Sequence, residues 1–340
     1  MASVRRLALL VVLGLAVTLA ACASDETSTP TTASTALPAG TTPGATGDVG
    51  SLGEVRPAVE PTGTVTHASL TMPDGAERTY RLYLPSTFDP EVPTPLLVAL
   101  HGGLGWGDQF AETNHVEGLA EANGFVVVHP DGTRIRPRLP SGTWNGGYCC
   151  GPAAADQVDD VGFVAAALDD VGQKMRIDPS RTYAMGHSNG GIMSYRLACE
   201  LGDRIVGIGV VGASLGVDTC TPPAPVSLMH IHGLADVNHP IDGGPGEGVA
   251  DVVFRPARKG VETMAAVDGC ATSTTTTEGD RTTETWTGCD DDSAVAFVRI
   301  AGASHAWPGG TPGRSVSGPT YEGYDATAAI WAFLMAHPRR

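Results

Sequence analysis

Short apolar runs, separated by amphipathic segments, recur along most of the chain. Two early segments, 65–72 and 77–84, alternate apolar and polar side chains with a period near two, which is typical of half-buried strands. Later apolar runs are continuous, as expected of strands covered on both faces. They occupy 95–100, 124–129, 182–185, 205–211, 226–232 and 294–300.

Segments with helical spacing lie between these runs. The pattern predicts helices over 114–122, 159–175, 191–201, 257–267 and 321–336, and a Thr-rich hairpin over 272–287. Strands that alternate with helices predict an α/β fold with a mainly parallel, twisted sheet and helices on both faces. Ligands of such sheets bind beyond the carboxyl ends of the strands.

The N-terminal segment does not fit this pattern. Arg5 and Arg6 precede an apolar stretch, residues 7–21, that is shorter than the about 20 residues of a membrane span. It ends in Leu19-Ala20-Ala21-Cys22, which resembles a bacterial lipobox. We therefore expect a lipoprotein signal peptide and a lipid on Cys22; an ordinary secretory signal and an uncleaved anchor are the alternatives. Each of these places the protein outside the cytoplasm.

The predicted domain organisation follows from composition. Residues 1–21 form the signal peptide, and residues 22–52 are rich in Ser, Thr, Pro and Gly, which predicts a flexible tether. Residues 53–340 are long enough for one large domain, which we expect to be tethered to the outer face of the cell membrane as a monomer.

The charge balance narrows the range of partners. The formal net charge is −16, from 37 acidic and 21 basic side chains. So acidic a chain is a poor binder of nucleic acid. Soluble molecules or neutral polymers are the expected substrates.

The cysteines predict disulfides. With Cys22 lipidated, six of the seven remain, and an even number in an exported domain favours pairing. Cys270 and Cys289, which flank the predicted hairpin, are the first expected pair, and Cys199 with Cys220, near the end of the helix 191–201 and after the strand that follows it, is the second. Cys149 and Cys150 are adjacent, so they form a vicinal bridge or pair elsewhere. Zinc ligation is not expected, because no C-x-x-C spacing occurs.

One turn between a strand and a helix carries a candidate nucleophile. The apolar run 182–185 stops at Gly186-His187-Ser188-Asn189-Gly190, and a helical segment follows at once. This G-x-S-x-G pattern is typical of a nucleophile elbow, in which side chains beside the serine would collide with the adjoining strand and helix. The alternative is an ordinary glycine-rich turn.

A base and an acid follow later strands. A serine hydroxyl needs a base to act as a nucleophile. His305 follows the last predicted strand and Asp236 follows the strand before it, so Ser188, Asp236 and His305 share one edge of the sheet. A structural histidine and a turn-forming aspartate are the alternatives for each alone. Their order along the chain is that of the triad in α/β-hydrolases.

The same edge holds a candidate oxyanion hole. His101-Gly102-Gly103 follows the strand 95–100, and its glycines allow close approach of backbone to substrate. We expect the N–H groups of Gly103 and Asn189 to be the donors, with Gly102 or Leu104 as replacements for Gly103.

Other polar and aromatic residues have two interpretations. Trp307, Trp144 and His187 are candidates for contact with the substrate, or they are packing residues. His230 and His232 lie near Asp236 and His239, which makes a metal site conceivable; buried strand histidines bonded to backbone explain them as well. We favour the latter and expect neither metal nor cofactor.

Taken together, the motifs resemble a known family. They are L-H-G-G, W-N-G-G-Y-C-C-G, D-D-V-G-F, G-H-S-N-G-G-I-M-S-Y-R-L-A-C-E, H-I-H-G-L-A-D and H-A-W-P-G. Over residues 63–338 the chain resembles the secreted poly(3-hydroxybutyrate) depolymerase-like esterases, which are similar to the feruloyl and acetyl-xylan esterases of carbohydrate esterase family 1. The resemblance implies an α/β-hydrolase fold, ester hydrolysis without a cofactor, and Ser188, Asp236 and His305 as the triad.

The sequence therefore predicts a serine carboxylesterase that works through an acyl-enzyme. The connection between the strands 205–211 and 226–232 is short, which leaves no room for a large lid. The expected substrates are hydroxyalkanoate oligomers, or feruloyl and acetyl groups on plant polysaccharide. A non-catalytic surface binding protein is the alternative from another class, and a peptidase on the same fold ranks below it.

Overall fold

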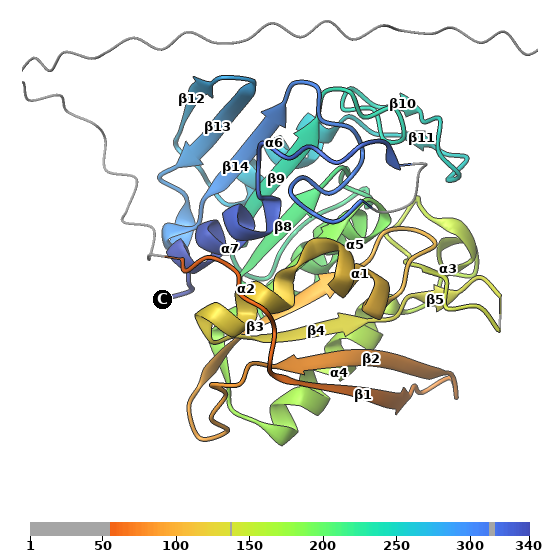
Figure 1. The fold of residues 1–340 in the computed structure, drawn as a ribbon. Coiled ribbons are helices and arrows are strands. Elements are labelled where there is room, and N and C mark those ends of the chain that lie inside the picture. The colour runs from red at the N-terminus through yellow and green to blue at the C-terminus, as the bar shows by residue number, and fades with distance from the viewer. Residues whose placement is uncertain (1–54, 137, 313–316) are drawn as a thin grey trace, which may run out of the picture. The chain divides into compact units, whose positions relative to one another are not determined.

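Ten strands form a sheet through the part of the chain that this computed structural model describes, residues 55–136, 138–312 and 317–340 (Figure 1). Their order across the sheet is β1-β2-β4-β3-β7-β8-β9-β14-β13-β12. They span β1 Thr64–Thr71, β2 Glu77–Leu84, β3 Thr94–Leu100, β4 Val126–Pro130, β7 Ile177–His187, β8 Gly207–Val211, β9 Ser227–Gly233, β12 Thr272–Glu278, β13 Arg281–Thr287 and β14 Val295–Ile300. Two short pairs accompany the sheet, β5 Thr133–Arg134 with β6 Gly142–Thr143 and β10 Gly244–Pro245 with β11 Val253–Phe254.

The middle of the sheet is parallel and its edges are antiparallel. Strands β4, β3, β7, β8, β9 and β14 run in one direction, with Leu97 opposite both Val127 and Tyr183. At the edges, β1 and β2 form an antiparallel pair beside β4, and β12 and β13 form another beside β14. Because the central strands are parallel, the segments that follow them emerge at the same edge of the sheet.

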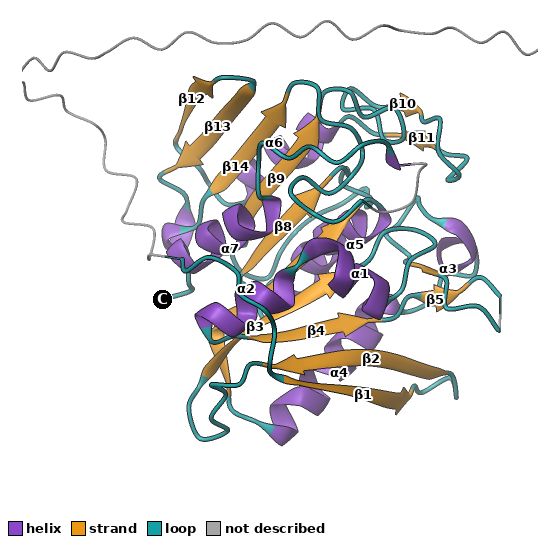
Figure 2. Ribbon diagram, in the orientation of Figure 1, coloured by secondary structure: helices purple, strands orange, loops and turns teal. Residues whose placement is uncertain are grey.

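Helices cover both faces of the sheet (Figure 2). Their bounds are α1 Gly107–Asn114, α2 Val116–Asn123, α3 Gly151–Ala155, α4 Asp160–Lys174, α5 Asn189–Leu201, α6 Ala257–Val267 and α7 Ala326–Ala336, with a 3₁₀ turn η1 at Asp290–Asp292. Residues of α4, α5 and α6 join one apolar core, and residues of α1, α2 and α7 join the other.

Strand β3 shows how one strand serves both cores. Leu96, Val98 and Leu100 pack on the side of α4 and α5, while Leu97 and Ala99 pack on the side of α1 and α2. All five side chains are at most 1% exposed. The continuous apolar run is therefore explained by burial on both faces, as predicted.

Most predicted elements are present, and two boundaries need correction. The helix expected over 114–122 is α2, which begins at Val116, and a further helix, α1, precedes it; His115, in a left-handed conformation with φ 57°, separates the two. Helix α1 was not predicted, because its sequence, G-D-Q-F-A-E-T-N, is short and mostly polar. The closing helix begins at Ala326 rather than Tyr321, because the Asp325 side chain caps it by accepting a hydrogen bond from the Ala328 N–H.

Three disulfides join the six cysteines of the described region. They are Cys149–Cys150, Cys199–Cys220 and Cys270–Cys289. The last two are the pairs that the sequence favoured, and the first is the vicinal bridge that it left open. Cys22, together with the predicted signal peptide and tether, lies outside the described residues. Within the described ranges, no helix combines the length and the apolar character needed to cross a membrane.

Candidate active site

Ser188 occupies a strained turn between β7 and α5. Its φ of 54° and ψ of −121° lie outside the regions that a residue with a side chain normally adopts. The flanking glycines permit this turn. A Cβ on Gly186 would lie 2.2 Å from the carbonyl oxygen of Gly190, and a Cβ on Gly190 would lie 2.2 Å from that of Leu100. The steric reason for the G-x-S-x-G pattern is therefore present in the structure.

Asp236 and His305 meet at the ends of neighbouring strands. Asp236 follows β9 and His305 follows β14, and these two strands are parallel neighbours. The His305 Nδ1–H donates to Asp236 Oδ2 at 2.7 Å. The other carboxylate oxygen, Oδ1, accepts from the N–H groups of Asn238 and His239 at 2.9 and 2.8 Å. Burial alone would raise the pKa of Asp236, but the hydrogen bond and charge of His305, with help from His232 and the His239 N–H, lower it below its usual value.

Ser188 and His305 line the same cavity, which has a volume of about 320 Å³. These two described side chains do not form a hydrogen bond with each other. Contacts of this kind are often long without substrate and tighten in the complex. The elbow thus presents the hydroxyl to a cavity in which the His305–Asp236 pair is already assembled.

The candidate oxyanion donors come from two segments of the chain that meet at the cavity. Gly103 and Asn189 both line the cavity, and a Cβ built on Gly103 would lie 3.8 Å from the Asn189 Cβ. Neither N–H group has a hydrogen-bond partner among the described residues. The N–H of Leu104 donates to the Gly142 carbonyl at 2.8 Å, so Leu104 is unsuited to the alternative role that the sequence left open. Gly102 also borders the cavity.

His187 and Trp307 are both in the lining of the cavity. The His187 Nε2–H donates to the carbonyl oxygen of His305 at 2.6 Å. Burial, reinforced by the charge of His305, lowers the pKa of His187 to about 3, so this ring is neutral at physiological pH. The Trp307 ring packs edge-on against Phe110, and its Nε1–H donates to Thr327.

Trp144 lies behind the cavity rather than in its lining. Its side chain is fully buried, and its Nε1–H donates to the His101 carbonyl at 2.9 Å. The Asn189 side chain bonds both backbone groups of Trp144. The structure thus corresponds to the core interpretation of this tryptophan. The same loop reaches the cavity further on, through Cys150, Gly151 and Pro152.

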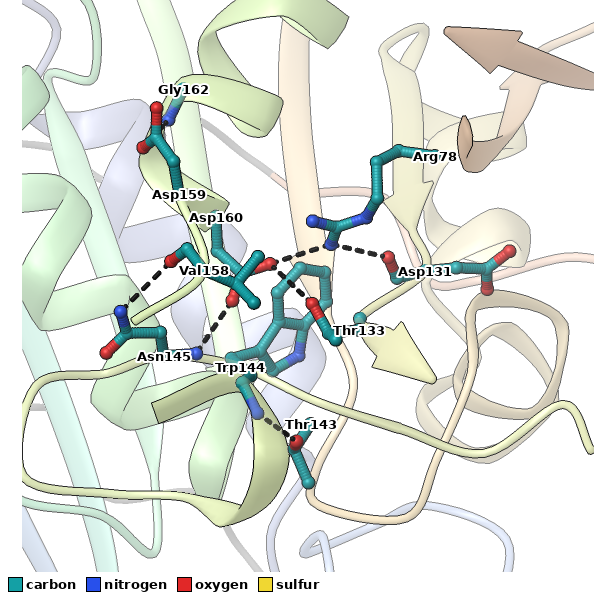
Figure 3. Close-up of polar contacts among 12 residues, drawn as sticks. Arg78, Asp131, Thr133, Thr143, Trp144, Asn145, Val158, Asp159, Asp160 and Gly162 are labelled. Carbon is teal, nitrogen blue, oxygen red and sulfur yellow. Dashed lines mark hydrogen bonds and ion pairs between the residues drawn. The ribbon is translucent and has the colours of Figure 1, made fainter. Parts of the chain in front are cut away.

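A buried ion pair holds this loop in place (Figure 3). Asp160 accepts from the Arg78 guanidinium and from the Asn145 N–H, both at 2.7 Å, and Arg78 also donates to the Asp131 carbonyl. The Asn145 amide donates in turn to the Val158 carbonyl. Burial raises the pKa of Asp160, against the opposing effect of Arg78. No role for Arg78 or Asp160 was predicted from the sequence.

A segment after Asp236 supplies another wall. Residues 238–254, which carry β10 and β11, contribute Asn238, Gly248, Val249, Ala250 and Phe254 to the lining. This wall was not predicted from the sequence. The lining as a whole contains no Asp, Glu, Lys or Arg of the described chain, and much of it is apolar. Such a cavity suits an uncharged organic group.

The buried histidines near Asp236 bond to other parts of the protein. His230 bonds to Tyr195 and to His232, and His232 bonds to the His239 carbonyl. In the described ranges, no group of three or more His, Cys, Asp or Glu residues has an arrangement that could hold a metal ion.

Sequence comparison relates the chain to esterases. Residues 78–241 match the family model described as esterase PHB depolymerase. The putative esterase NocK of Nocardia uniformis subsp. tsuyamanensis is 28% identical over 279 residues, covering 76% of this chain and 78% of that protein. Feruloyl esterase B of Piromyces equi is 27% identical over 230 residues, 65% of this chain; the match spans only 41% of that longer protein.

Solved structures show the same fold. An acetyl xylan esterase from Aspergillus awamori aligns with a TM-score of 0.51 at 16% identity, covering 71% of this chain and 94% of that one. A CE1 ferulic acid esterase from Anaeromyces mucronatus aligns with a TM-score of 0.50 at 14% identity, covering 81% and 90%. The predicted α/β-hydrolase fold is confirmed, and so is the resemblance to the polyhydroxybutyrate depolymerase-like and feruloyl esterases.

Proposed function

We propose that this protein, an α/β-hydrolase with esterases among its relatives, is a serine carboxylesterase that works through an acyl-enzyme. The observation that carries the proposal is the hydrogen-bonded His305–Asp236 pair in the same cavity as Ser188 at its strained elbow. The match to an esterase family model and the names of the relatives support the reaction class.

In this mechanism each group has one task. His305 takes the proton of the Ser188 hydroxyl as its oxygen attacks the ester carbonyl, and returns that proton to the leaving alcohol. Asp236 holds the imidazole in the correct tautomer and stabilises its charged form. The N–H groups of Gly103 and Asn189 stabilise the oxyanion, and the N-terminal end of α5 adds a favourable dipole. Water then hydrolyses the acyl-enzyme with His305 as the base.

The lining of the cavity guides the choice of substrate. The described residues that line it include no Asp, Glu, Lys or Arg, which favours a neutral acyl or alcohol group. We propose hydroxyalkanoate oligomers as the leading substrates, in line with the family model that matches residues 78–241. Feruloyl or acetyl esters of plant polysaccharide are the second candidate, favoured by the names of the curated relatives.

Replacing the nucleophile tests the reaction. Ser188→Ala should lower the turnover of p-nitrophenyl butyrate by something on the order of 10⁶-fold, because the acyl-enzyme cannot form. A variant that is folded by circular dichroism and keeps its rate would remove Ser188 from the mechanism. For the active wild type, kcat/KM on 3-hydroxybutyrate oligomers, methyl ferulate and acetylated xylan ranks the substrate classes.

We also propose the domain organisation and location that the sequence predicts. Residues 1–21 are a lipoprotein signal peptide, residues 22–52 are a tether, and the catalytic domain, 53–340, is held outside the cell by a lipid on Cys22. Cys22→Ala should move the protein from the membrane fraction to the soluble fraction while the kcat on p-nitrophenyl butyrate stays unchanged. Persistent sedimentation with membranes would contradict the lipid anchor.

A further inference from the structure

A line of buried hydrogen bonds connects the elbow helix to the turn that carries Asp236. Tyr195 lies on α5, seven residues after Ser188, and His230 and His232 lie on β9. The Tyr195 hydroxyl is 2.7 Å from His230 Nδ1, and His230 Nε2 is 3.1 Å from His232 Nδ1. The three residues are at most 1% exposed. The proposed mechanism uses none of them.

The far end of this line fixes the position of one proton. His232 Nε2 lies 2.8 Å from the carbonyl oxygen of His239 and 3.6 Å from Asp236 Oδ2. A carbonyl oxygen can only accept a hydrogen bond, and so can a carboxylate. The proton of His232 is therefore on Nε2.

The remaining protons follow in sequence. Burial lowers the pKa of both His230 and His232, so both rings are neutral and each carries one N–H. With its proton on Nε2, His232 offers a bare Nδ1, which accepts from the His230 Nε2–H. His230 then has a bare Nδ1, which accepts from the Tyr195 O–H. Every donor in the line meets an acceptor.

If the donor and acceptor roles along this chain of hydrogen bonds are reversed, one donor is left without an acceptor. This reversal requires an extra proton on His232, with His230 donating through Nδ1 to the Tyr195 oxygen. The Tyr195 O–H would then lack an acceptor, because His230 is the only hydrogen-bond partner of this hydroxyl within the described residues. An unsatisfied buried hydroxyl and a buried charge are both unfavourable.

The chain of hydrogen bonds ends at the short turn that carries both Asp236 and His239. His239 donates its N–H to Asp236 Oδ1, and its carbonyl accepts from His232. His232 thus holds the residue that orients the carboxylate, and it also directs an N–H toward the oxygen that receives the His305 bond. A neighbouring buried histidine, His239 itself, bonds elsewhere, to Ser214.

We propose that His232 is a positioning residue for Asp236, and that Tyr195 and His230 fix its tautomer with the proton on Nε2. The proposal rests on the proposed role of Asp236 in the triad. It links the helix behind the nucleophile to the turn that carries the acid, through side chains that do not touch the cavity.

Nuclear magnetic resonance of the wild-type protein tests the tautomers directly. Long-range ¹H–¹⁵N spectra distinguish a histidine protonated on Nε2 from one protonated on Nδ1. We expect both His230 and His232 to be neutral and protonated on Nε2 at pH 7. A proton on Nδ1 of either ring would overturn the proposal, whatever the variants below show.

A double-mutant cycle tests the positioning role. His232→Asn removes the Nε2 donor and should lower kcat by about 10- to 100-fold, as is typical when a partner that orients a reactive residue is lost. In an Asp236→Asn background the same change should cost less than about twofold, because His232 acts through Asp236. If His232 had only a structural role, His232→Asn would lower kcat by the same factor in both backgrounds, and that result would overturn the proposal.

Matched variants sharpen the cycle. In His232→Gln the amide nitrogen can occupy the position of Nε2, so we expect part of the lost rate to return. His129→Asn makes the same change at another fully buried histidine, on β4, away from the cavity lining, and should leave kcat unchanged. Active-site titration corrects each rate for the folded fraction. If Asp236→Asn itself kept the wild-type rate, the triad would fail rather than the tautomer assignment.

Discussion

Two buried aspartates flank strand β9 and have opposite electrostatic environments. Asp236, after the carboxyl end of the strand, accepts from His305 and from two backbone N–H groups. Asp268, which ends α6, accepts at Oδ1 from the N–H of Val226, just before the strand begins. Its Oδ2 has no hydrogen-bond partner among the described residues. Both aspartates are at most 5% exposed, so the difference lies in their partners rather than in their burial.

The two pKa values move in opposite directions. The pKa of Asp236 is lowered, since its hydrogen bonds outweigh the effect of burial. Burial raises the pKa of Asp268 to about 7, and the charge of Asp290 adds to this. A carboxylate that must stabilise an imidazolium has to be ionised, and the carboxyl edge of the sheet supplies the donors that keep it so. At the amino edge burial outweighs the effect of the Val226 N–H and of the Ser293 hydroxyl, so Asp268 binds a proton more readily than Asp236 does.

Of the substitutions that compare the two aspartates, removal of the charge of Asp236 should have the largest effect. Asp236→Asn should lower kcat by about 10⁴-fold, because an amide does not hold His305 in the tautomer that accepts the serine proton. The measurement is the hydrolysis of p-nitrophenyl butyrate at pH 7 to 8. If this variant were as fast as the wild type, activity would not depend on an ionised Asp236, and the difference between the two aspartates would have no functional consequence.

The same substitution at Asp268 is the matched control. Asp268→Asn changes one atom at the other end of β9, far along the chain from the cavity lining, and should keep kcat within about twofold of the wild type. A comparable loss of activity in both variants would mean that the substitution acts through general damage to the sheet.

The contribution of Asp268 to the pH dependence of stability should have the opposite sign to that of Asp236. A lowered pKa, as at Asp236, stabilises the fold above pH 4 and loses this effect as the pH falls through the folded-state value. A raised pKa works the other way: between about pH 4 and 7 the folded state keeps a proton that the unfolded state releases. Stability should therefore fall as the pH rises to 7, by up to about 4 kcal/mol for a shift of about three units.

Asp268→Asn should remove this loss. The amide has no proton to release and its oxygen can still accept from the Val226 N–H. We expect the melting temperatures of wild type and variant to agree near pH 4, to diverge between about pH 4 and 7, and to keep a constant gap above pH 7, with the variant the more stable. Calorimetric scans from pH 4 to 8.5 measure the difference. Parallel curves for the two proteins would show that Asp268 ionises in the fold as it does in water.

The part of the site that sequence could predict depends on short-range features. Ser188, Asp236 and His305 each lie within five residues of the end of a strand, and parallel pairing brings those ends to one edge. The elbow was predictable because its G-x-S-x-G pattern is contiguous in sequence, although a neighbour within a few residues requires only Gly186, while the Leu100 carbonyl on β3 requires Gly190. The strands themselves were predictable because burial on two faces leaves a continuous apolar run.

The missed features depend on contacts between distant residues. Arg78 and Asp160 are 82 positions apart and bond only in the folded chain, so neither has a local signal. The cavity wall formed by residues 238–254 has two-residue strands and no periodic pattern. The state of Asp268 depends on the lack of a partner for one oxygen, which a sequence does not reveal.

The smallest expected effect concerns the neighbour that helps to hold Asp268 neutral. Asp290 donates its N–H to the Asp268 carbonyl, and the negative charge of its side chain raises the pKa of Asp268. Asp290→Asn should move the midpoint of the stability–pH curve down by on the order of half a unit, because the ionised form of Asp268 becomes less unfavourable. Asp291→Asn, a like change at the next residue, should leave the midpoint in place.

The two midpoints come from melting temperatures at closely spaced pH values in low salt, where charge effects are least screened. Equal shifts in both variants would assign the effect to the net charge of η1. No shift in either would leave burial alone as the cause of the raised pKa, and the contrast with Asp236 would then depend on missing donors and not on a repelling neighbour.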